Sequence, residues 1–286
     1  KGRKRPRRDI EGDSGSVVGI SVESDSVNLS RKGVQKSLQE NCVRNESSGL
    51  ESFCRDSSSD VTPVRILFTG VDRDEEMERM VRCIGAEIVN DPLDGATHCI
   101  TANALKRTPK LLISINCGVK YVVSTHWLVD SSKAGRPLDI NLDARGSAAY
   151  IVKDPKKEKQ WKFSLVATLK KARSSVPGLF NGISFYITKG VCGSGAPPTE
   201  EMQQIIESGG GEWITVLPRS RKKQDSFSRP IVISCDSAAS KEITKTVMDF
   251  ARSGPGAGIY TVEFVFLAIL RQSVEFDSGL LKGYSF

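Results

Sequence analysis

One segment of this chain occurs twice, at an offset of 125 residues. Residues 74–89 read DEEMERMVRCIGAEIV and residues 199–214 read TEEMQQIIESGGGEWI, with five identical positions in an ungapped alignment. Each copy has an acidic first turn, apolar residues at helical spacing and a glycine that ends the helical pattern. Each therefore predicts an amphipathic helix followed by a short strand. Such a repeat indicates two similar folding units rather than one.

Short apolar strands and further helices flank both copies in the same order. In the first unit we expect strands at 65–70, 86–89, 98–101 and 120–124, and helices at 74–85, 111–118 and 125–135. The second unit repeats this order, with strands at 183–188, 230–234 and 259–261 and helices around 241–251 and at 262–272. Strands that alternate with helices through short links are typical of an α/β fold, a parallel sheet covered on both faces.

The segment before the first unit has a different composition. Residues 1–60 are rich in Ser, Asn, Gly, Asp and Glu and show no sustained periodicity, so we expect a disordered tail over 1–62. This tail starts with KGRKRPRR, which favours a nuclear localisation signal; a solvated basic run is the alternative. Because the first residue is Lys rather than Met, we also expect a longer parent protein.

A linker joins the two units. KDPKKEKQWKF is charged and turn-like, whereas residues 164–174 predict a helix with Leu165, Val166 and Leu169 on one stripe. An apolar stripe needs a surface to pack on, and we expect this surface at the junction of the units; packing on one unit alone is the alternative. The predicted segments are the tail 1–62, a first domain 63–138, the linker 139–177 and a second domain 178–286.

The net charge is a weak indication of the partner. The formal charge is +7, of which +6 belongs to residues 61–286. A positive folded region favours anionic partners, but strong nucleic-acid binders usually have a denser stripe of Lys and Arg. DNA is therefore a possible, secondary partner.

Local motifs offer neither a catalytic set nor a metal site. The seven cysteines are irregularly spaced without a CxxC pair, and the only histidines, His98 and His126, have no evident nucleophile partner. We expect neither enzymatic activity nor a cofactor. Scattered cysteines are typical of reduced thiols, and no apolar run approaches the ~18–20 residues that cross a bilayer, so we expect a location in the cytosol or nucleus.

Polar residues at two separate places predict an anion site. Thr69 and Gly70 end the first strand, at the edge where parallel sheets place their ligands. Thr108 is a good N-cap, Pro109 suits the first helical position, and Lys110 then falls in the first turn. A cation there is unfavourable for the helix dipole, so Lys110 indicates a bound phosphate held by helix N–H groups, a hydroxyl and an ammonium. A plain turn and a solvated helix start are the alternatives for each place taken alone.

An ordered set of motifs resembles a known family, the tandem BRCT repeats, and in particular the C-terminal pairs of mediator of DNA damage checkpoint proteins. The set comprises LFTG in the first strand, RTPK at the second helix, Trp127 in the third helix and YIVKDPKKEKQWKFSL before the linker helix, together with the duplication. The resemblance covers about residues 64–275. It implies two tandem BRCT domains, each a four-stranded parallel sheet flanked by three helices, joined by a linker helix.

The resemblance also implies roles for individual residues. In that family a Ser or Thr hydroxyl, the backbone amide of the glycine that follows it and the lysine of RTxK hold a phosphoserine or phosphothreonine. The resemblance implies that Thr69, Gly70 and Lys110 hold the phosphate group here. Arg107 is implied to bind the peptide main chain at the third residue after the phosphate, or the terminal carboxylate.

A specificity pocket between the repeats is implied to include Leu112, Pro197 and Glu201. Glu201 departs from the family member that reads the phosphorylated histone-variant tail, which has a Gln there. A carboxylate near a peptide's terminal carboxylate costs affinity unless Arg107 or another cation pairs it. The second repeat lacks RTxK, and Phe264 replaces Trp127, so we expect it to build the cleft without holding the phosphate, with both aromatic side chains in the core.

The sequence therefore predicts a non-enzymatic phosphopeptide-binding scaffold of the nuclear DNA damage response. The expected partners are a phosphorylated protein, foremost the phosphorylated C-terminal tail of a histone variant, and other DNA repair proteins. Two alternatives stay open: a DNA-end or chromatin DNA binding module, and a scaffold that binds its partner irrespective of phosphorylation.

Overall fold

The computed structural model describes residues 63–142, 150–193, 196–217, 230–236, 241–253 and 256–286. The predictions for residues 1–62, namely disorder and a nuclear localisation signal, lie outside these ranges. Within them, no helix is both long enough and apolar enough to span a membrane.

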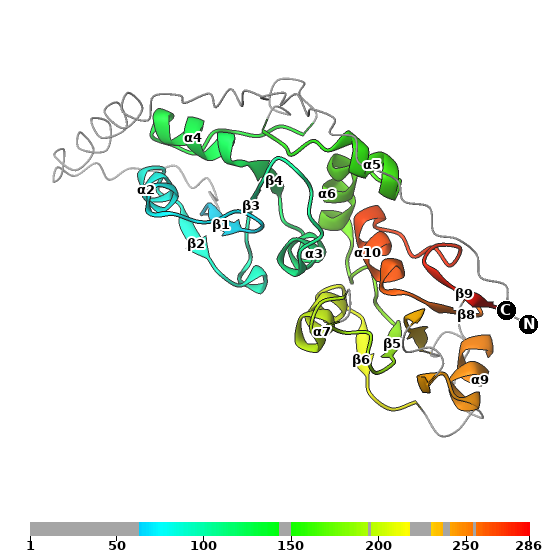
Figure 1. The fold of residues 1–286 in the computed structure, drawn as a ribbon. Helices are drawn as coiled ribbons and strands as arrows, with labels where there is room; N and C mark the ends of the chain where they lie inside the picture. Colours follow the sequence, from blue (N-terminus) through cyan, green and yellow to red (C-terminus); the bar gives the residue numbers. More distant parts are fainter. Residues whose placement is uncertain (1–62, 143–149, 194–195, 218–229, 237–240, 254–255) are drawn as a thin grey trace, which may run out of the picture.

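The first repeat is a parallel four-stranded sheet with helices on both faces (Figure 1). Its elements are β1 (Arg65–Phe68), α2 (Glu75–Cys83), β2 (Glu87–Val89), the 3-10 turn η1 (Pro92–Asp94), β3 (His98–Thr101), α3 (Pro109–Asn116), β4 (Tyr121–Ser124) and α4 (Thr125–Ala134). The strand order is β2-β1-β3-β4. Strands and helices lie where the apolar pattern predicts them, and four strands are confirmed here.

The second repeat has the same arrangement with one strand more. Its elements are β5 (Ser184–Ile187), α7 (Thr199–Ser208), β6 (Glu212–Ile214), β7 (Ile231–Ile233), α9 (Lys245–Ser253), β8 (Gly258–Tyr260), α10 (Val262–Arg271) and β9 (Leu280–Ser285). The order β6-β5-β7-β8 matches that of the first repeat and confirms the duplication.

The predicted count of four strands is one short for the second repeat. Strand β9 pairs antiparallel with β8, and Gly283 inside it weakens its strand pattern in the sequence. The first repeat has a reduced form of the same feature, because Val123 and Ile151 form an isolated antiparallel bridge beyond β4. In both repeats the chain thus returns to the same edge of the sheet.

The linker contains two helices, α5 (Pro155–Trp161) and α6 (Leu165–Ser174). The expectation of a turn-like segment at α5 was wrong, because the Asp154 side chain caps this helix by accepting from Lys157 N (3.1 Å). In α6 the buried residues are Leu165, Thr168, Leu169 and Ala172. Val166, expected on this stripe, is half-buried.

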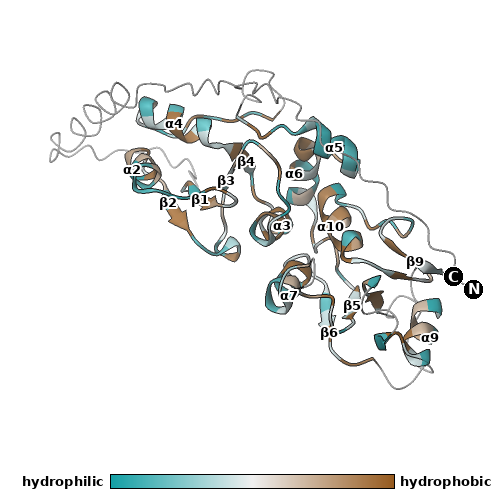
Figure 2. Ribbon diagram, viewed as in Figure 1, coloured by the Kyte–Doolittle hydropathy of each residue, from teal (hydrophilic) through white to brown (hydrophobic). Residues whose placement is uncertain are grey.

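The junction between the repeats is helical. Helix α3 packs against α7 and α10, and α6 contacts both α3 and α10, so the expected position of the linker helix at the junction is confirmed (Figure 1). Figure 2 shows apolar residues along α3 and α10, in contrast to the hydrophilic α5. One hydrophobic cluster runs through both repeats and includes Trp127 and Phe264, which confirms both as core residues.

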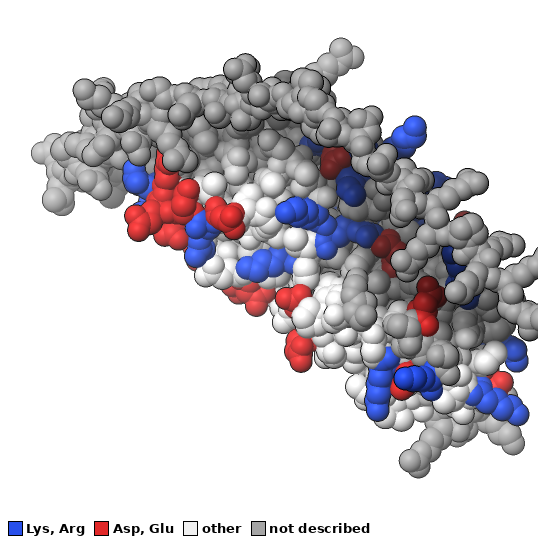
Figure 3. All heavy atoms as spheres, in the orientation of Figure 1, with Lys and Arg blue, Asp and Glu red and all other residues white. Residues whose placement is uncertain are grey.

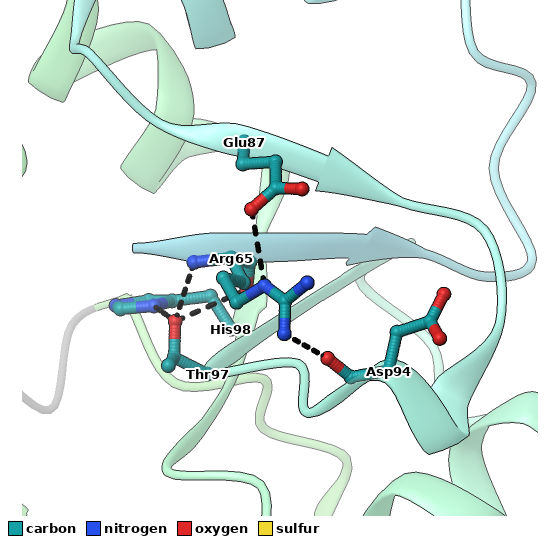
Figure 4. Close-up of polar contacts among 5 residues, drawn as sticks. All are labelled: Arg65, Glu87, Asp94, Thr97 and His98. Carbon is teal, nitrogen blue, oxygen red and sulfur yellow. Dashed lines mark hydrogen bonds and ion pairs between the residues drawn. The ribbon is translucent and has the colours of Figure 1, made fainter. Parts of the chain in front are cut away.

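Polar contacts close the amino-terminal edge of the first sheet (Figure 4). Arg65 Nε donates to Glu87 (3.1 Å), and a second guanidinium nitrogen donates to the Asp94 carbonyl. The Thr97 hydroxyl accepts from Arg65 N (2.9 Å) and lies 2.9 Å from Nδ1 of His98. Side chains of the sheet and its loops therefore occupy the end at which the strands begin. The predicted ligand site lies at the opposite end, where the strands terminate.

Candidate functional site

The end of β1 and the start of α3 meet through two hydroxyl groups. Thr69 Oγ1 lies 2.6 Å from Thr108 Oγ1, and Thr108 also caps α3 by accepting from Leu111 N (3.2 Å). Thr69 is only 5% exposed. The structure thus brings together Thr69 and Thr108, which the sequence placed on separate elements, and the helix-capping expectation for Thr108 is confirmed.

Gly70 follows the end of β1 in a left-handed conformation, with φ of +64°. The backbone N–H of Thr69 bonds to Ile100 O (3.0 Å), so the N–H of Gly70 is the next along the chain, beyond the strand. A Cβ at Gly70 would lie 3.7 Å from Thr101 Oγ1 and 3.8 Å from Lys106 Cδ, which are ordinary contacts. The positive φ, rather than crowding, therefore favours glycine here. The Lys106 side chain lies beside this turn.

Lys110 occupies the first turn of α3 and is exposed. Burial raises the pKa of the neighbouring Cys99 thiol to about 12, and the positive charge of Lys110 acts against this rise. Cys99 lies in β3, the neighbour of β1, which ends just before Thr69. The first turn of α3, which carries Lys110, thus begins beside the hydroxyls of Thr69 and Thr108. Helix N–H groups, hydroxyls and a lysine are the groups that bind phosphate in proteins.

Arg107 has a defined partner in the second repeat. Its Nη1 and Nη2 atoms donate to the two carboxylate oxygens of Glu263 at 2.6 and 2.7 Å. Its guanidinium carbon also lies 4.5 Å from the centroid of a Trp161 ring and 5.3 Å from that of Phe266. The Arg107 side chain is 20% exposed. Arg107 is thus held at the junction by Glu263 and not by Glu201.

The three predicted pocket residues lie in different surroundings. Leu112 is completely buried in α3, so its side chain has no surface open to a ligand in this structure. Pro197 is half-buried, and Glu201 is exposed in the first turn of α7. Among the described residues, Glu201 forms no ion pair. The specificity pocket stays a prediction.

Charged side chains are unevenly distributed over the face that carries the junction. Figure 3 shows Lys and Arg side chains in a row across the middle of this face, while Asp and Glu gather at the end formed by α2. The acidic residues in the first turn of α2 are Glu75, Glu76 and Glu78. An anionic ligand would therefore be attracted to the junction more than to the α2 end.

In the second repeat, Thr188 follows strand β5 as Thr69 follows strand β1 in the first. Thr188 Oγ1 donates to Ser234 Oγ at 2.8 Å, and these residues are 2% and 0% exposed. Ser234 Oγ thus accepts the proton of the Thr188 hydroxyl in the interior, and the RTPK motif has no counterpart in this repeat. The missing RTPK motif is the feature that separates this repeat from the first, and the expectation that only the first repeat holds a phosphate stays a prediction.

Sequence reasoning missed three residues around Arg107, namely Trp161, Glu263 and Phe266. Glu263 lies 156 positions from Arg107, so no local pattern could connect them. The sequence did offer one signal for Trp161. It is the one large aromatic residue of α5, which is otherwise polar and precedes α6.

Comparisons with known protein families agree with the fold. Residues 178–278 match the profile of the BRCT domain, and residues 51–143 match that of the Regulator of Ty1 transposition protein 107 BRCT domain. Human Mediator of DNA damage checkpoint protein 1 is 34% identical over 225 residues, which are 77% of this chain and 9% of that protein. Mouse PAX-interacting protein 1 is 31% identical over 226 residues, 77% of this chain and 19% of that protein. The chain thus spans less than a fifth of these relatives.

Solved structures show the same pair of domains. The BRCT5-BRCT6 domains of S. pombe Brc1 superpose with a TM-score of 0.61 at 22% identity, covering 77% of this chain and 98% of that one. The complex structure of Rtt107p with a phosphorylated histone gives a TM-score of 0.53 at 17% identity, covering 80% of this chain and 96% of that one. At these identities the similarity shows the fold. The chain belongs to the BRCT family and carries two BRCT domains in tandem, resembling those of mediator of DNA damage checkpoint protein 1.

Proposed function

We propose that this chain is a phosphopeptide-binding scaffold module of the nuclear DNA damage response. The single observation that carries the proposal is the contact between Thr69 and Thr108 at the start of α3, next to Gly70 and Lys110. It joins two hydroxyls at a helix N-terminus, beside the turn at Gly70, and the first turn of this helix carries a lysine without an acidic partner among the described residues. A dianionic phosphate is the ligand that suits these groups.

The hydrogen-bond inventory is consistent with this assignment. Thr108 Oγ1 accepts from Leu111 N and can still donate its proton to Thr69 Oγ1. Thr69 then keeps its own proton for a phosphate oxygen, because each hydroxyl has one donor and two acceptor sites. Thr108 would thus orient the Thr69 hydroxyl while it caps the helix.

The proposed class of partner, a phosphorylated protein, is based on what related proteins are named for and have been solved with. Mediator of DNA damage checkpoint protein 1 is a DNA damage checkpoint protein by name, and Rtt107p has been solved with a phosphorylated histone. We extend this to a phosphoserine ligand for the present chain, with a phosphorylated histone-variant tail as the foremost candidate and a nuclear location. Arg107 would contact the third residue after the phosphate, or its carboxylate, with donors that Glu263 leaves free.

Lys110→Met tests the proposal directly. We expect the affinity for a phosphoserine peptide, measured by fluorescence polarisation, to fall by about 10- to 100-fold, because a charge-assisted hydrogen bond contributes ~1.5–3 kcal/mol. Lys171→Met, an exposed lysine on α6, is the matched control and should bind like the unchanged protein.

Two results would contradict phosphate recognition. Equal affinity for phosphorylated and unphosphorylated peptide would favour a scaffold that ignores phosphorylation. Binding to duplex DNA that falls steeply with salt, combined with no preference for the phosphorylated peptide, would favour the DNA-binding alternative.

A further inference from the structure

The guanidinium of Arg107 is enclosed by groups from two other elements. Glu263 of α10 accepts from both terminal nitrogens at 2.6 and 2.7 Å. The ring of Trp161, the last residue of α5, lies 4.5 Å from the guanidinium carbon, and the ring of Phe266 on α10 lies 5.3 Å from it. Contacts of this kind are cation–π interactions. The linker therefore contributes an aromatic face to a residue of the first repeat.

This enclosure leaves Arg107 able to bind a ligand. A guanidinium has five N–H donors, and the pair with Glu263 uses two of them. The Arg107 side chain is 20% exposed, so part of it faces solvent. An arginine that is free to rotate loses up to ~2 kcal/mol of side-chain entropy when it is ordered. Aromatic contacts that order the side chain in advance reduce this loss on binding.

Trp161 itself is anchored on both sides of the site. Asp154, the cap of α5, accepts from Leu105 N at 3.2 Å, which ties the helix to the segment that leads into Arg107. At the other end of α5, Arg271 of α10 donates from Nε to the Trp161 carbonyl oxygen at 3.0 Å. Trp161 is 8% exposed, and the ammonium of Lys157 lies 4.9 Å from its ring. The position of the ring is thus set by both repeats.

We infer that Trp161 is a positioning residue that holds the Arg107 guanidinium ready for the third residue after the phosphate, so that the linker helix α5 takes part in specificity. This inference rests on the proposed function of the same site. Trp161 would not touch the phosphate. Trp161 would therefore affect only the affinity that the third residue of the peptide adds through its contact with Arg107.

The test uses two phosphopeptides. One ends with a free carboxylate at the third residue after phosphoserine, and the other is truncated after the first residue and amidated. The ratio of their dissociation constants, measured by isothermal titration calorimetry, gives the benefit of the third residue. We expect Trp161→Leu to reduce this benefit about three- to tenfold, and Trp161→Phe, which keeps an aromatic face, to restore most of it.

Arg107→Gln is the benchmark, because it removes the guanidinium itself. The double variant with Trp161→Leu should lose no more of the third-residue benefit than Arg107→Gln alone, since both changes act through one group. Binding of the truncated phosphopeptide should stay unchanged in Trp161→Leu, which separates positioning from a general loss of structure.

Three results would overturn the inference: no third-residue benefit in the unchanged protein, an unaltered benefit in Trp161→Leu, or an equal loss of affinity for both peptides. Failure of the proposed function has a different signature, because the unchanged protein would then bind unphosphorylated versions of both peptides as tightly as the phosphorylated ones. Should Trp161→Leu not fold, Trp161→Phe and Trp161→Met provide the same comparison.

Discussion

The hydroxyl of Thr108 belongs to two systems at once. It caps α3 through Leu111 N and contacts the Thr69 hydroxyl at 2.6 Å. A serine would keep both contacts, whereas a valine would lose both. Helix stability and the geometry of the candidate site therefore depend on the same oxygen atom.

The ionisation of His98 depends strongly on the fold. It is 6% exposed and lies against the rings of Tyr121 and Trp127, with centroid distances of 5.0 and 4.5 Å. Burial, with a smaller effect of the Lys120 charge, lowers the pKa of His98 to about 4. The folded protein thus holds a neutral imidazole at neutral pH.

This neutral histidine makes stability depend on pH. In the unfolded chain the pKa is near its ordinary value of about 6.5, so between pH ~6.5 and ~4 the unfolded state binds more protons. The contribution of the neutral His98 to the free energy of unfolding is therefore fully present above pH ~6.5 and is lost as the pH falls toward ~4. We expect the free energy of unfolding in urea to decrease by about 2 kcal/mol more between pH 7.5 and 5.0 in the unchanged protein than in His98→Gln. Equal decreases in the two proteins would contradict this.

At the scale of the element, the linker differs most from expectation. Helix α5 is rich in lysine and has no apolar stripe, so periodicity could not reveal it. What defines it is local capping, because Asp154 accepts from Lys157 N and Pro155 occupies the first turn. Glu158 of α5 also accepts from Leu165 N, the first residue of α6, at 2.8 Å. These contacts engage both carboxylates with the backbone.

Helix α6 stabilises the junction through its buried face. Leu169 is 0% exposed, whereas Val166 on the same helix is half-buried. We expect Leu169→Ala to lower the free energy of unfolding by about 2–5 kcal/mol, because it leaves a cavity in a closed environment. The matched variant Val166→Ala should lower it by less than about 1 kcal/mol. Urea unfolding followed by circular dichroism measures both values, and similar losses would show that the buried face is assigned wrongly.

For the whole molecule, the continuity of the core is decisive. One cluster of buried apolar residues includes Ile66 of the first sheet, Leu169 of the linker and Phe185 of the second sheet. Asn116 of α3 also donates to Ile205 O of α7 at 2.9 Å, and Arg107 pairs with Glu263 across the same junction. The two repeats therefore stabilise one another.

A continuous core predicts a single unfolding transition. The three tryptophans report on different parts of the chain: Trp127 on the first repeat, Trp161 on the linker and Trp213 on the second repeat. In three variants that each keep one tryptophan and carry phenylalanine at the other two positions, fluorescence and circular dichroism should give the same urea midpoint within each variant. A fluorescence change of Trp127 or Trp213 at a urea concentration where most helix persists would show that the repeats unfold separately.

The sequence by itself determined the repeated units, the positions of most strands and helices, and the phosphate-site candidates Thr69, Gly70, Thr108 and Lys110. These features are encoded by apolar periodicity, helix caps and strand ends, which act over a few neighbouring residues. The tertiary structure alone decided the pairing of Arg107 with Glu263, its contact with Trp161, the burial of Leu112 and the edge strand β9. Those outcomes depend on which surfaces the two repeats present to each other, and residues 156 positions apart carry no local signal of their contact.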